Sequence, residues 1–518
     1  MKLASRRNAW LFLSCVVLVP LIIFVGCCDG LGIILKATTS SSKSAEYGND
    51  LDGSATVVWK VYNSEFVSIW QEPLNKLLYE KGASYKVKIE FYEPSGDDKE
   101  SYVDTLEKMK QDGEPSDVIA LPDTIYPIIA DRGLLMPLDD FIVSEKGSAI
   151  VNALPVRDLA RCKYNGVTYG ISAHIRTIGA IAYNKEYLEK YDIDVANLSA
   201  DIFENVEALQ TIKDGEGGKV TPYAYNDNIL DSFGLWRCLG LSPIDTAECI
   251  AQTQQGATVN LFETAILRET LFKLKGFKDK GLIGFVSESG YDTFFATDTS
   301  VHREDVFESS FTYFTSGQGI TVETVVVPNI NRPQIAPLWG DTQTGIASWS
   351  SNKESALNFL TLLYTDTDIA NLIQYGTEGK EHTMQNGEAA YLPGNLLWVF
   401  GENYTNTFIT HHQIDTSSNK IAFQTMYYEK CESFVPDGFR FDLKQVGAEI
   451  ESVNAVYYKS TDTYELSNTV KKLFTLNTQN IDDAISEINA NLKTGGIYLI
   501  IEEFDRQLAA WRAAYDEN

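Results

Sequence analysis

Hydrophobic and polar positions along the chain alternate with two different periods, one typical of strands and the other of helices. Apolar residues occupy every second position over 85–92, which predicts a strand, and every third or fourth position over 66–80, which predicts a helix. The β-rich run 56–62, a helical stretch at 102–111 and the apolar run 117–121 complete a strand–helix–strand–helix–strand order. This order predicts right-handed crossovers and a mainly parallel sheet, and therefore an α/β fold.

The ends of the predicted strands carry polar side chains. In open parallel sheets, ligands sit beyond the carboxyl ends of the strands. Asn63 and Glu65 follow the first strand and Asp123 follows the strand at 117–121, so all three are candidate binding residues. Because Asp123 also follows Pro122, a turn or a helix cap is its alternative role.

A second α/β region lies further along the chain. It contains predicted strands at 180–183 and 221–225. The β-branched run 321–327 ends at Pro328 and predicts a strand that crosses back to the first region. A further strand is predicted at 345–349, followed by the start of a helix.

The C-terminal part has two apolar stripes, separated by a pair of glycines. The stripes consist of Ile481, Ile485, Ile488 and Leu492, and then of Ile500, Phe504, Leu508 and Trp511. Spacings of three or four residues place each set on one face of a helix. We expect both faces to pack onto the body of the protein.

The N-terminus has the pattern of an export signal. A basic start with Lys2 leads into an apolar run over 9–25, and Gly26 precedes Cys27. This arrangement is typical of a cleaved secretory signal rather than of part of a fold. It also resembles the lipobox of bacterial lipoproteins, in which the cysteine after the cut is acylated. The resemblance implies a signal peptide at 1–26 and lipidation at Cys27.

The stretch that follows is rich in serine and threonine as far as about residue 53, and predicts a flexible tether at 27–53. The alternative is an uncleaved anchor, although the apolar run is slightly shorter than the roughly 20 residues that span a bilayer. Both interpretations place the bulk of the chain outside the cytoplasm and hold it at a membrane.

Charge narrows the range of partners. The 518 residues include 43 basic and 71 acidic side chains, which gives a net charge of −28. Because proteins bind nucleic acid through Lys and Arg that neutralise phosphates, this excess of acid argues against nucleic acid as a partner. The length suggests roughly two to four domains.

Cysteine and histidine patterns predict neither a disulfide framework nor a metal site. The seven cysteines are scattered, and no Cys-x-x-Cys pair occurs. A pair between Cys238 and Cys249 stays open, with separate buried thiols as the favoured interpretation. The five histidines form no His-Glu-x-x-His motif. We therefore expect no metal and no organic cofactor.

Several blocks of sequence occur in a characteristic order. They are Asp117-Val118-Ile119-Ala120-Leu121 with Gly133-Leu134-Leu135, Asn165-Gly166-Val167-Thr168-Tyr169-Gly170-Ile171 with Ile181-Ala182-Tyr183-Asn184-Lys185-Glu186, and Gly345-Ile346-Ala347-Ser348-Trp349-Ser350 with Ala356-Leu357-Asn358-Phe359-Leu360. In this order they resemble the family 1 extracellular solute-binding proteins of ABC importers, most of which bind sugars. The later blocks 370–380, 438–442 and 502–508 resemble a subgroup of Gram-positive lipoproteins that has its own C-terminal domain of unassigned function.

The resemblance implies a two-lobe periplasmic-binding-protein-like fold with crossing hinge strands and a helical C-terminus. By similarity, lobe one comprises residues 54–175 plus 328–380. Lobe two comprises residues 176–327 plus 381–518 and includes the C-terminal helices. Ligand is bound in the cleft between the lobes, which close about the hinge.

Sugars present hydroxyl groups and flat C–H faces, so a sugar site needs polar side chains for hydrogen bonds and aromatic rings for stacking. The resemblance adds further candidates near the crossings and at the end of a strand of lobe two. They are His174, Arg176, Tyr223, Tyr225, Asn226, Trp236, Trp339 and Asp341. A place in the core is the alternative for each tryptophan, and an inter-lobe salt bridge is the alternative for Arg176.

The resemblance predicts a monomeric lipoprotein on the extracellular face of the membrane. It implies that this protein captures a carbohydrate, with an oligosaccharide as the expected ligand, and delivers it to ABC permease subunits with a cytoplasmic ATPase. The rival interpretations are a lipid-anchored enzyme that processes glycans, and the same fold with a peptide or another small solute as ligand. We expect no enzyme, because no Gly-x-Ser-x-Gly, P-loop or zinc motif occurs.

Overall fold

A computed structural model describes residues 55–62, 67–94, 99–172, 177–199, 201–225, 239–244, 247–285, 294–302, 310–314, 321–328, 342–392, 404–411, 434–460 and 465–515. The predicted signal peptide, Cys27 and the tether lie outside these ranges and stay predictions. Within the described ranges, no helix is both long and apolar enough to cross a membrane.

Lobe one is built on a five-stranded sheet in the order β2-β1-β3-β16-β6. β1 (Ala55–Val61) pairs in parallel with β2 (Tyr85–Phe91) and β3 (Val118–Pro122). β16 (Thr342–Ile346) runs antiparallel to both β3 and β6 (Gly170–Ile171). The parallel core predicted from the order of strands and helices is therefore confirmed, and β16 and β6 complete the sheet.

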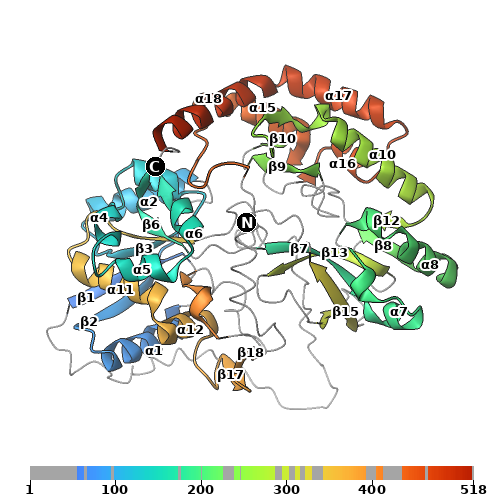
Figure 1. Cartoon of the computed structure of the whole chain (residues 1–518). Coiled ribbons are helices and arrows are strands. Elements are labelled where there is room, and N and C mark those ends of the chain that lie inside the picture. Colours follow the sequence, from blue (N-terminus) through green and yellow to red (C-terminus); the bar gives the residue numbers. More distant parts are fainter. Residues whose placement is uncertain are drawn as a thin grey trace, which may run out of the picture.

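Helices surround this sheet (Figure 1). They are α1 (Val67–Glu80), α2 (Lys99–Gln111), α3 (Tyr126–Asp131), α4 (Asp139–Ile142), α5 (Ser148–Ala153), α6 (Val156–Arg161), α11 (Lys353–Thr365) and α12 (Thr367–Tyr375). A small hairpin of β4 (Lys163–Tyr164) and β5 (Val167–Thr168) precedes β6. α1 confirms the helix predicted over 66–80 and buries Trp70, Leu74 and Leu78, whereas Ile69 and Leu77 are only partly buried.

Lobe two is built on a six-stranded sheet in the order β12-β8-β13-β7-β15-β14. Its strands are β7 (Thr177–Asn184), β8 (Thr221–Tyr225), β12 (Ile283–Phe285), β13 (Phe294–His302), β14 (Ser310–Phe314) and β15 (Thr321–Pro328). Its helices are α7 (Lys185–Lys190), α8 (Val206–Glu216) and α10 (Ala265–Asp279), with short 3-10 turns η3 (Val195–Asn197), η4 (Ile202–Glu204) and η6 (Leu261–Glu263). A separate sheet contains β9 (Leu241–Ile244), β10 (Ala247–Thr253) and β11 (Thr258–Asn260).

The described residues from 434 to 515 form what we call the C-terminal domain. It contains α15 (Gly447–Tyr457), the hairpin β19 (Tyr458–Ser460) with β20 (Glu465–Leu466), α16 (Asn468–Phe474), α17 (Ile481–Thr494) and α18 (Ile497–Tyr515). Both predicted apolar stripes are confirmed as buried faces of α17 and α18, except that Trp511 is only partly buried. In Figure 1, α17 and α18 form an arch above the two lobes, and the C-terminus lies beside lobe one.

Two large apolar cores show how the chain is divided. One lies in lobe one and includes Trp59, Trp70 and Tyr404. The other joins the lobe-two sheet to the C-terminal domain, with Tyr225 and Phe474 in the same cluster. The C-terminal domain and lobe two therefore share a continuous hydrophobic core.

The predicted domain boundary at 380/381 differs from this packing over residues 382–391 and 404–411, since Tyr391 also packs against the core of lobe one. Between α12 and the C-terminal domain, the structure describes β17 (His382–Gln385), β18 (Glu388–Tyr391) and η9 (Thr407–Ile409). The Tyr404 ring packs edge-to-face against Trp59 and Trp70 in the core of lobe one, and the Thr405 hydroxyl donates to the Leu363 carbonyl over 2.6 Å. The segment 404–411 therefore packs on lobe one, whereas the sequence assigned it to lobe two.

One predicted strand is displaced along the chain. The sequence predicts a strand at 345–349, but β16 spans Thr342–Ile346. Register explains the difference, because Thr342 pairs with Pro122 and Ile346 with Val118. The length of β3 therefore determines where β16 begins and ends. The predicted strand over 321–327 is confirmed as β15, which ends at Pro328.

Candidate functional site

The carboxyl ends of the parallel strands of lobe one meet at one edge of its sheet. Because β1, β2 and β3 run in the same direction, they end together at Val61, Phe91 and Pro122. β16 runs in the opposite direction and begins at this edge, where Thr342 pairs with Pro122. The Tyr62 hydroxyl lies 2.5 Å from the Thr342 hydroxyl, which joins the end of β1 to the start of β16.

Lobe two presents a corresponding edge. β8 runs parallel to β13, and β7 runs antiparallel to β13, so Tyr225 at the end of β8 lies at the same edge as Thr177 at the start of β7. β15 also ends here, with Pro328 opposite Ala180. Both segments that link the two sheets therefore attach to lobe two at the edge where Tyr225 lies.

The link into lobe two leaves lobe one beside Asp123. Ile171 at the end of β6 pairs with Thr344, so the chain leaves the sheet at the carboxyl edge. The Tyr126 hydroxyl fixes this departure, because it accepts from the backbone N–H groups of Tyr169 and Gly170 at 2.9 and 3.1 Å and donates to the Cys162 carbonyl at 2.7 Å. Burial raises the pKa of Tyr126, so the hydroxyl keeps its proton.

Among the binding residues that the sequence predicts in lobe one, Asp123 is the only one within the described ranges. Its carboxylate is buried. Arg440 of the C-terminal domain binds it with two hydrogen bonds, Nη1 to Oδ2 at 2.7 Å and Nη2 to Oδ1 at 2.9 Å. The Gln343 side chain in β16 donates a third bond to Oδ1 over 2.9 Å. A forked guanidinium matches a carboxylate in this way. Asp123 thus receives a charged partner rather than serving only as a turn or cap.

Tyr223 and Tyr225 lie in the core of lobe two. Each side chain is 1% exposed. The Tyr225 hydroxyl donates to the Thr475 carbonyl of the C-terminal domain over 2.9 Å, and burial raises the pKa of Tyr225. Both residues belong to the hydrophobic core that lobe two shares with the C-terminal domain, and their contact with a ligand stays a prediction.

The remaining candidates and the predicted lipidation site lie outside the described residues. They are Asn63, Glu65, His174, Arg176, Asn226, Trp236, Trp339, Asp341 and Cys27. Several adjoin the two edges in sequence, because β1 ends at Val61, β7 begins at Thr177, β8 ends at Tyr225 and β16 begins at Thr342. Their roles as ligand contacts stay predictions.

Sequence reasoning missed Arg440 and Gln343. Arg440 belongs to the block 438–442, which was noted for its resemblance alone, and it lies 317 positions from Asp123. Gln343 lies in β16, upstream of the strand that the pattern predicts. Neither residue carries a local signal, since their common partner comes from a distant part of the chain.

No metal or disulfide chemistry is evident in the described ranges. They contain no cluster of three or more His, Cys, Asp or Glu side chains that could hold a metal ion. Cys249 is buried and forms no disulfide with any described residue, and Cys238 lies outside the described ranges. Burial raises the pKa of the Cys249 thiol, which keeps it protonated and unreactive.

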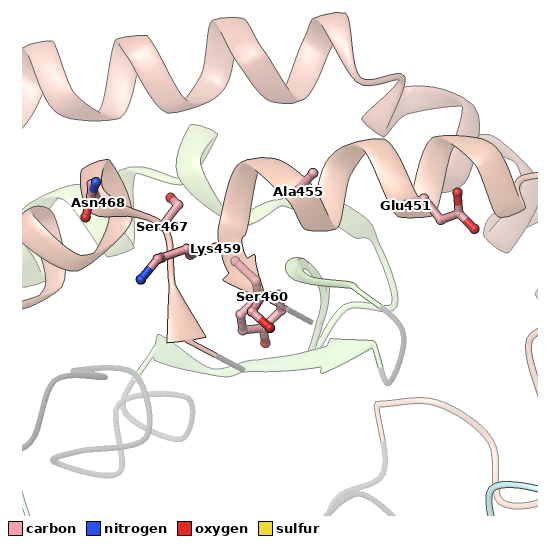
Figure 2. A pocket seen from close by; sticks show the side chains of 7 residues that line it. Glu451, Ala455, Lys459, Ser460, Ser467 and Asn468 are labelled. Atoms are coloured by element: carbon pink, nitrogen blue, oxygen red, sulfur yellow. The ribbon is translucent and has the colours of Figure 1, made fainter. Parts of the chain in front are cut away.

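A cavity of about 520 Å³ lies within the C-terminal domain, between α15, β19 and the start of α16 (Figure 2). It is lined by Glu451, Ala455, Tyr458, Lys459, Ser460, Ser467 and Asn468. None of these residues was predicted from the sequence. Lys459 pairs with Glu465 over 3.0 Å, and Glu451 adds an acidic side chain to the lining.

Comparison with known proteins gives consistent matches over most of the chain. The family described as bacterial extracellular solute-binding protein matches residues 79–378. A family described only as a domain of unknown function matches residues 436–513. A carbohydrate ABC transporter substrate-binding protein of Streptococcus pneumoniae serotype 4 is 25% identical over 464 residues, which cover 84% of this chain and 86% of the relative.

Solved structures share the fold. The crystal structure of an N-glycan transport solute binding protein from Streptococcus pneumoniae has a TM-score of 0.64 at 19% identity, covering 88% of this chain and 99% of that one. The same protein in complex with Man1GlcNAc has a TM-score of 0.55, with the same identity and coverage. An extracellular solute-binding protein from Bifidobacterium longum subsp. infantis has a TM-score of 0.56 at 13% identity, covering 89% and 99% of the two chains. These likenesses confirm the two-lobe α/β fold predicted from the sequence.

Proposed function

Because this chain belongs to the bacterial extracellular solute-binding protein family, we propose that it captures an oligosaccharide outside the cell and delivers it to an ABC importer. The family match over residues 79–378 carries the solute-binding part of the proposal. The carbohydrate part is supported by the relative from Streptococcus pneumoniae, which is named as a carbohydrate ABC transporter substrate-binding protein. It is further supported by the N-glycan transport protein of similar fold, which is described in complex with Man1GlcNAc and with Man5GlcNAc.

The ligand is proposed to bind between the carboxyl edge of lobe one and the edge of lobe two at Tyr225. Strands of both sheets end at these edges, and both linking segments attach there, which supports a site that closes as the lobes rotate. The predicted polar and aromatic residues that adjoin the edges would supply hydrogen bonds and stacking. Closure adds contacts from the second lobe, so the ligand binds the closed form more tightly than the open form. This difference in affinity shifts the protein towards the closed form.

Binding is tested on the full-length chain purified in detergent, with a panel of oligosaccharides and an equimolar panel of short peptides. We expect glycans to raise the melting temperature, because a ligand that binds only the folded state stabilises it. Isothermal titration then gives the affinity. If peptides bind and no glycan does, the carbohydrate assignment is wrong and a peptide or other small solute takes its place.

We also propose that the protein binds without turnover. The family consists of solute-binding proteins, and this supports a binder rather than an enzyme. Incubation with each oligosaccharide that binds, followed by an assay for new reducing ends, tests the point. Released reducing ends would identify a glycan-processing enzyme on this fold.

The lipid anchor is a separate proposal, based on the N-terminal pattern that ends at Cys27. Cleavage before Cys27 and acylation of its thiol and new amine would hold the receptor near the permease, since two or more acyl chains anchor stably where one does so marginally. Mass spectrometry of the mature N-terminus is the direct test. An unmodified Cys27 would leave the transport proposal in place and change only how the receptor is retained.

A further inference from the structure

The C-terminal domain contacts the two lobes in different ways. Against lobe two the contact is apolar, because one core contains residues of the lobe-two sheet, such as Tyr223 and Ile283, together with Leu473 and Ile488 of the C-terminal domain. An apolar interface of this kind resembles the interior of a single domain. The C-terminal domain and lobe two are therefore expected to move as one body.

Against lobe one the contact is polar and charged. Arg440 forms its forked pair with Asp123 and also donates to the Arg161 carbonyl over 3.4 Å. A second ion pair joins Arg157 of α6 to Asp437 over 3.1 Å between Nε and Oδ2. Both pairs come from one short segment of the C-terminal domain.

Close backbone packing brings this segment to lobe one. Gly438 has a φ of +89°, and a Cβ at this position would lie 2.8 Å from the Ala160 carbonyl oxygen. Any larger residue would push the segment away from α6. At the other end of the domain, Tyr515 of α18 lies so close to Gly166 that a Cβ there would clash with its ring.

An interface held by ion pairs and backbone contacts separates more readily than a shared apolar core, since its groups regain water on opening. Of the two contacts, the one with lobe one is therefore the one expected to open. Its strongest element is the Asp123–Arg440 pair at the carboxyl edge, where Asp123 is 3% and Arg440 12% exposed. The pair is thus shielded from solvent while the domain is seated.

We propose that the C-terminal domain is the latch of the two lobes, and that Arg440 is its positioning residue. With Arg440 on Asp123, the body formed by lobe two and the C-terminal domain is held against lobe one. Without this pair the lobes spend more time apart. The effect on ligand affinity rests on the proposed function, whereas the effect on lobe separation does not.

Lobe separation is measured as the distance between two spin labels, by pulsed electron paramagnetic resonance on the full-length chain in detergent without ligand. Spin labels at the exposed positions Asp104 of α2 and Glu502 of α18 are introduced as unnatural amino acids, so that native cysteines are untouched. Arg440→Gln is expected to move the distance distribution to longer values. Arg440→Lys keeps the charge but loses the fork, and should give an intermediate distribution.

The matched control is Arg268→Gln. Arg268 forms a forked pair of similar geometry with Asp482, at 2.6 and 2.8 Å, but this pair joins α10 to α17 and does not involve lobe one. Its loss should leave the distance distribution as in the wild type. If Arg440→Gln folds poorly because Asp123 is left as a buried charge, the double variant Asp123→Asn with Arg440→Gln removes both charges and is measured instead.

Affinity gives the second readout. For an oligosaccharide that the wild type binds, Arg440→Gln is expected to weaken binding about fivefold or more, because a smaller fraction of the protein is in the competent state. An unchanged distance distribution in both Arg440→Gln and the double variant overturns the latch, whatever the ligand. If the distances shift while the wild type binds no glycan, the latch stands and the carbohydrate proposal fails.

Discussion

The Tyr225 hydroxyl, at the end of β8, donates a 2.9 Å hydrogen bond to the carbonyl of Thr475, which follows the last residue of α16. The Lys278 ammonium group donates to the same oxygen over 2.7 Å. Carbonyls at the end of a helix have no partner within the helix, and this one is satisfied from lobe two. The hydrogen bond between Tyr225 and Thr475 therefore joins the lobe-two sheet to the C-terminal domain, across 250 positions of sequence.

Tyr225→Phe removes this bond while keeping the ring. We expect the free energy of unfolding to fall by about 1 kcal/mol, since one buried hydrogen bond is lost and Lys278 still satisfies the carbonyl. Urea denaturation measures the change, and Tyr79→Phe on the exposed face of α1 is the control that should leave stability unaltered. Ligand affinity is expected to stay within about twofold of wild type. A loss of about tenfold or more would instead place Tyr225 in contact with the ligand, as the sequence predicts.

Asp123→Ala leaves the Arg440 guanidinium in the interface without its carboxylate. We expect a loss of about 3–5 kcal/mol of stability, because breaking one side of a buried pair leaves an uncompensated charge. Adding Arg440→Met to Asp123→Ala should recover most of this loss. The control is Asp482→Ala in the exposed pair with Arg268, which should cost far less, because water screens an exposed ion pair. If Asp123→Ala and Asp482→Ala lose the same stability, the Asp123–Arg440 pair stabilises the protein no more than an exposed ion pair does.

Gly345 lies where β6 and β16 approach closely. A Cβ at this position would stand 2.6 Å from the Tyr169 carbonyl oxygen, a backbone atom that cannot rotate away. Gly345→Ala is therefore expected to destabilise lobe one by about 1–3 kcal/mol, as overpacked core sites do. Gly276→Ala in α10 meets no atom within 4 Å and should stabilise the protein by about 0.5–1 kcal/mol. Thermal unfolding of both variants checks the opposite signs.

Glu503 makes part of the stability of α18 dependent on pH. The Arg506 guanidinium, with help from Gln507, lowers the pKa of Glu503 to about 2. Because the folded pKa lies below the unfolded value of about 4.5, this stabilisation is present at neutral pH and is lost as the pH falls from about 4.5 towards 2. Glu503→Gln should flatten the fall of the melting temperature over that interval. The neighbouring variant Glu502→Gln, at an exposed position, is the control, and an identical acid profile in both variants would contradict the prediction.

Tyr404 tests where the segment 404–411 belongs. Its ring is 1% exposed and packs against Trp59 and Trp70 at 6.1 and 5.3 Å between centroids. Tyr404→Ala should cost about 3–5 kcal/mol, the range for removing a buried aromatic side chain, and should alter the tryptophan fluorescence of lobe one. Tyr498→Ala, at a half-exposed position of α18, is the control and should cost much less. A loss without any fluorescence change would separate the segment from lobe one.

The local elements of this fold follow from the sequence. Period-two alternation over 85–92 and helical spacing over 66–80 each depend on neighbouring residues, and both were confirmed as β2 and α1. The end of a strand depends on its partner instead. For this reason β16 starts three residues before the predicted strand at 345–349, where Thr342 meets Pro122.

The candidate site also combines a residue that the sequence predicts with a residue that only the folded structure brings there. The rule that ligands sit beyond the carboxyl ends of strands made Asp123 a candidate from the sequence, because the rule needs only the order of strands. The rule contains nothing about what else reaches that edge. Arg440 does so because the C-terminal domain folds back over lobe one, and no local pattern encodes that return.

The sequence by itself determined the alternation of strands and helices, the net negative charge and the resemblance that the family match confirmed. Only the tertiary structure decided that the C-terminal domain shares a core with lobe two, that the segment 404–411 packs on lobe one, and that Asp123 is held by Arg440. The physical reason is range. Periodicity and charge act between residues close in the chain, whereas shared cores and buried ion pairs bring together groups that meet only when the whole chain has folded.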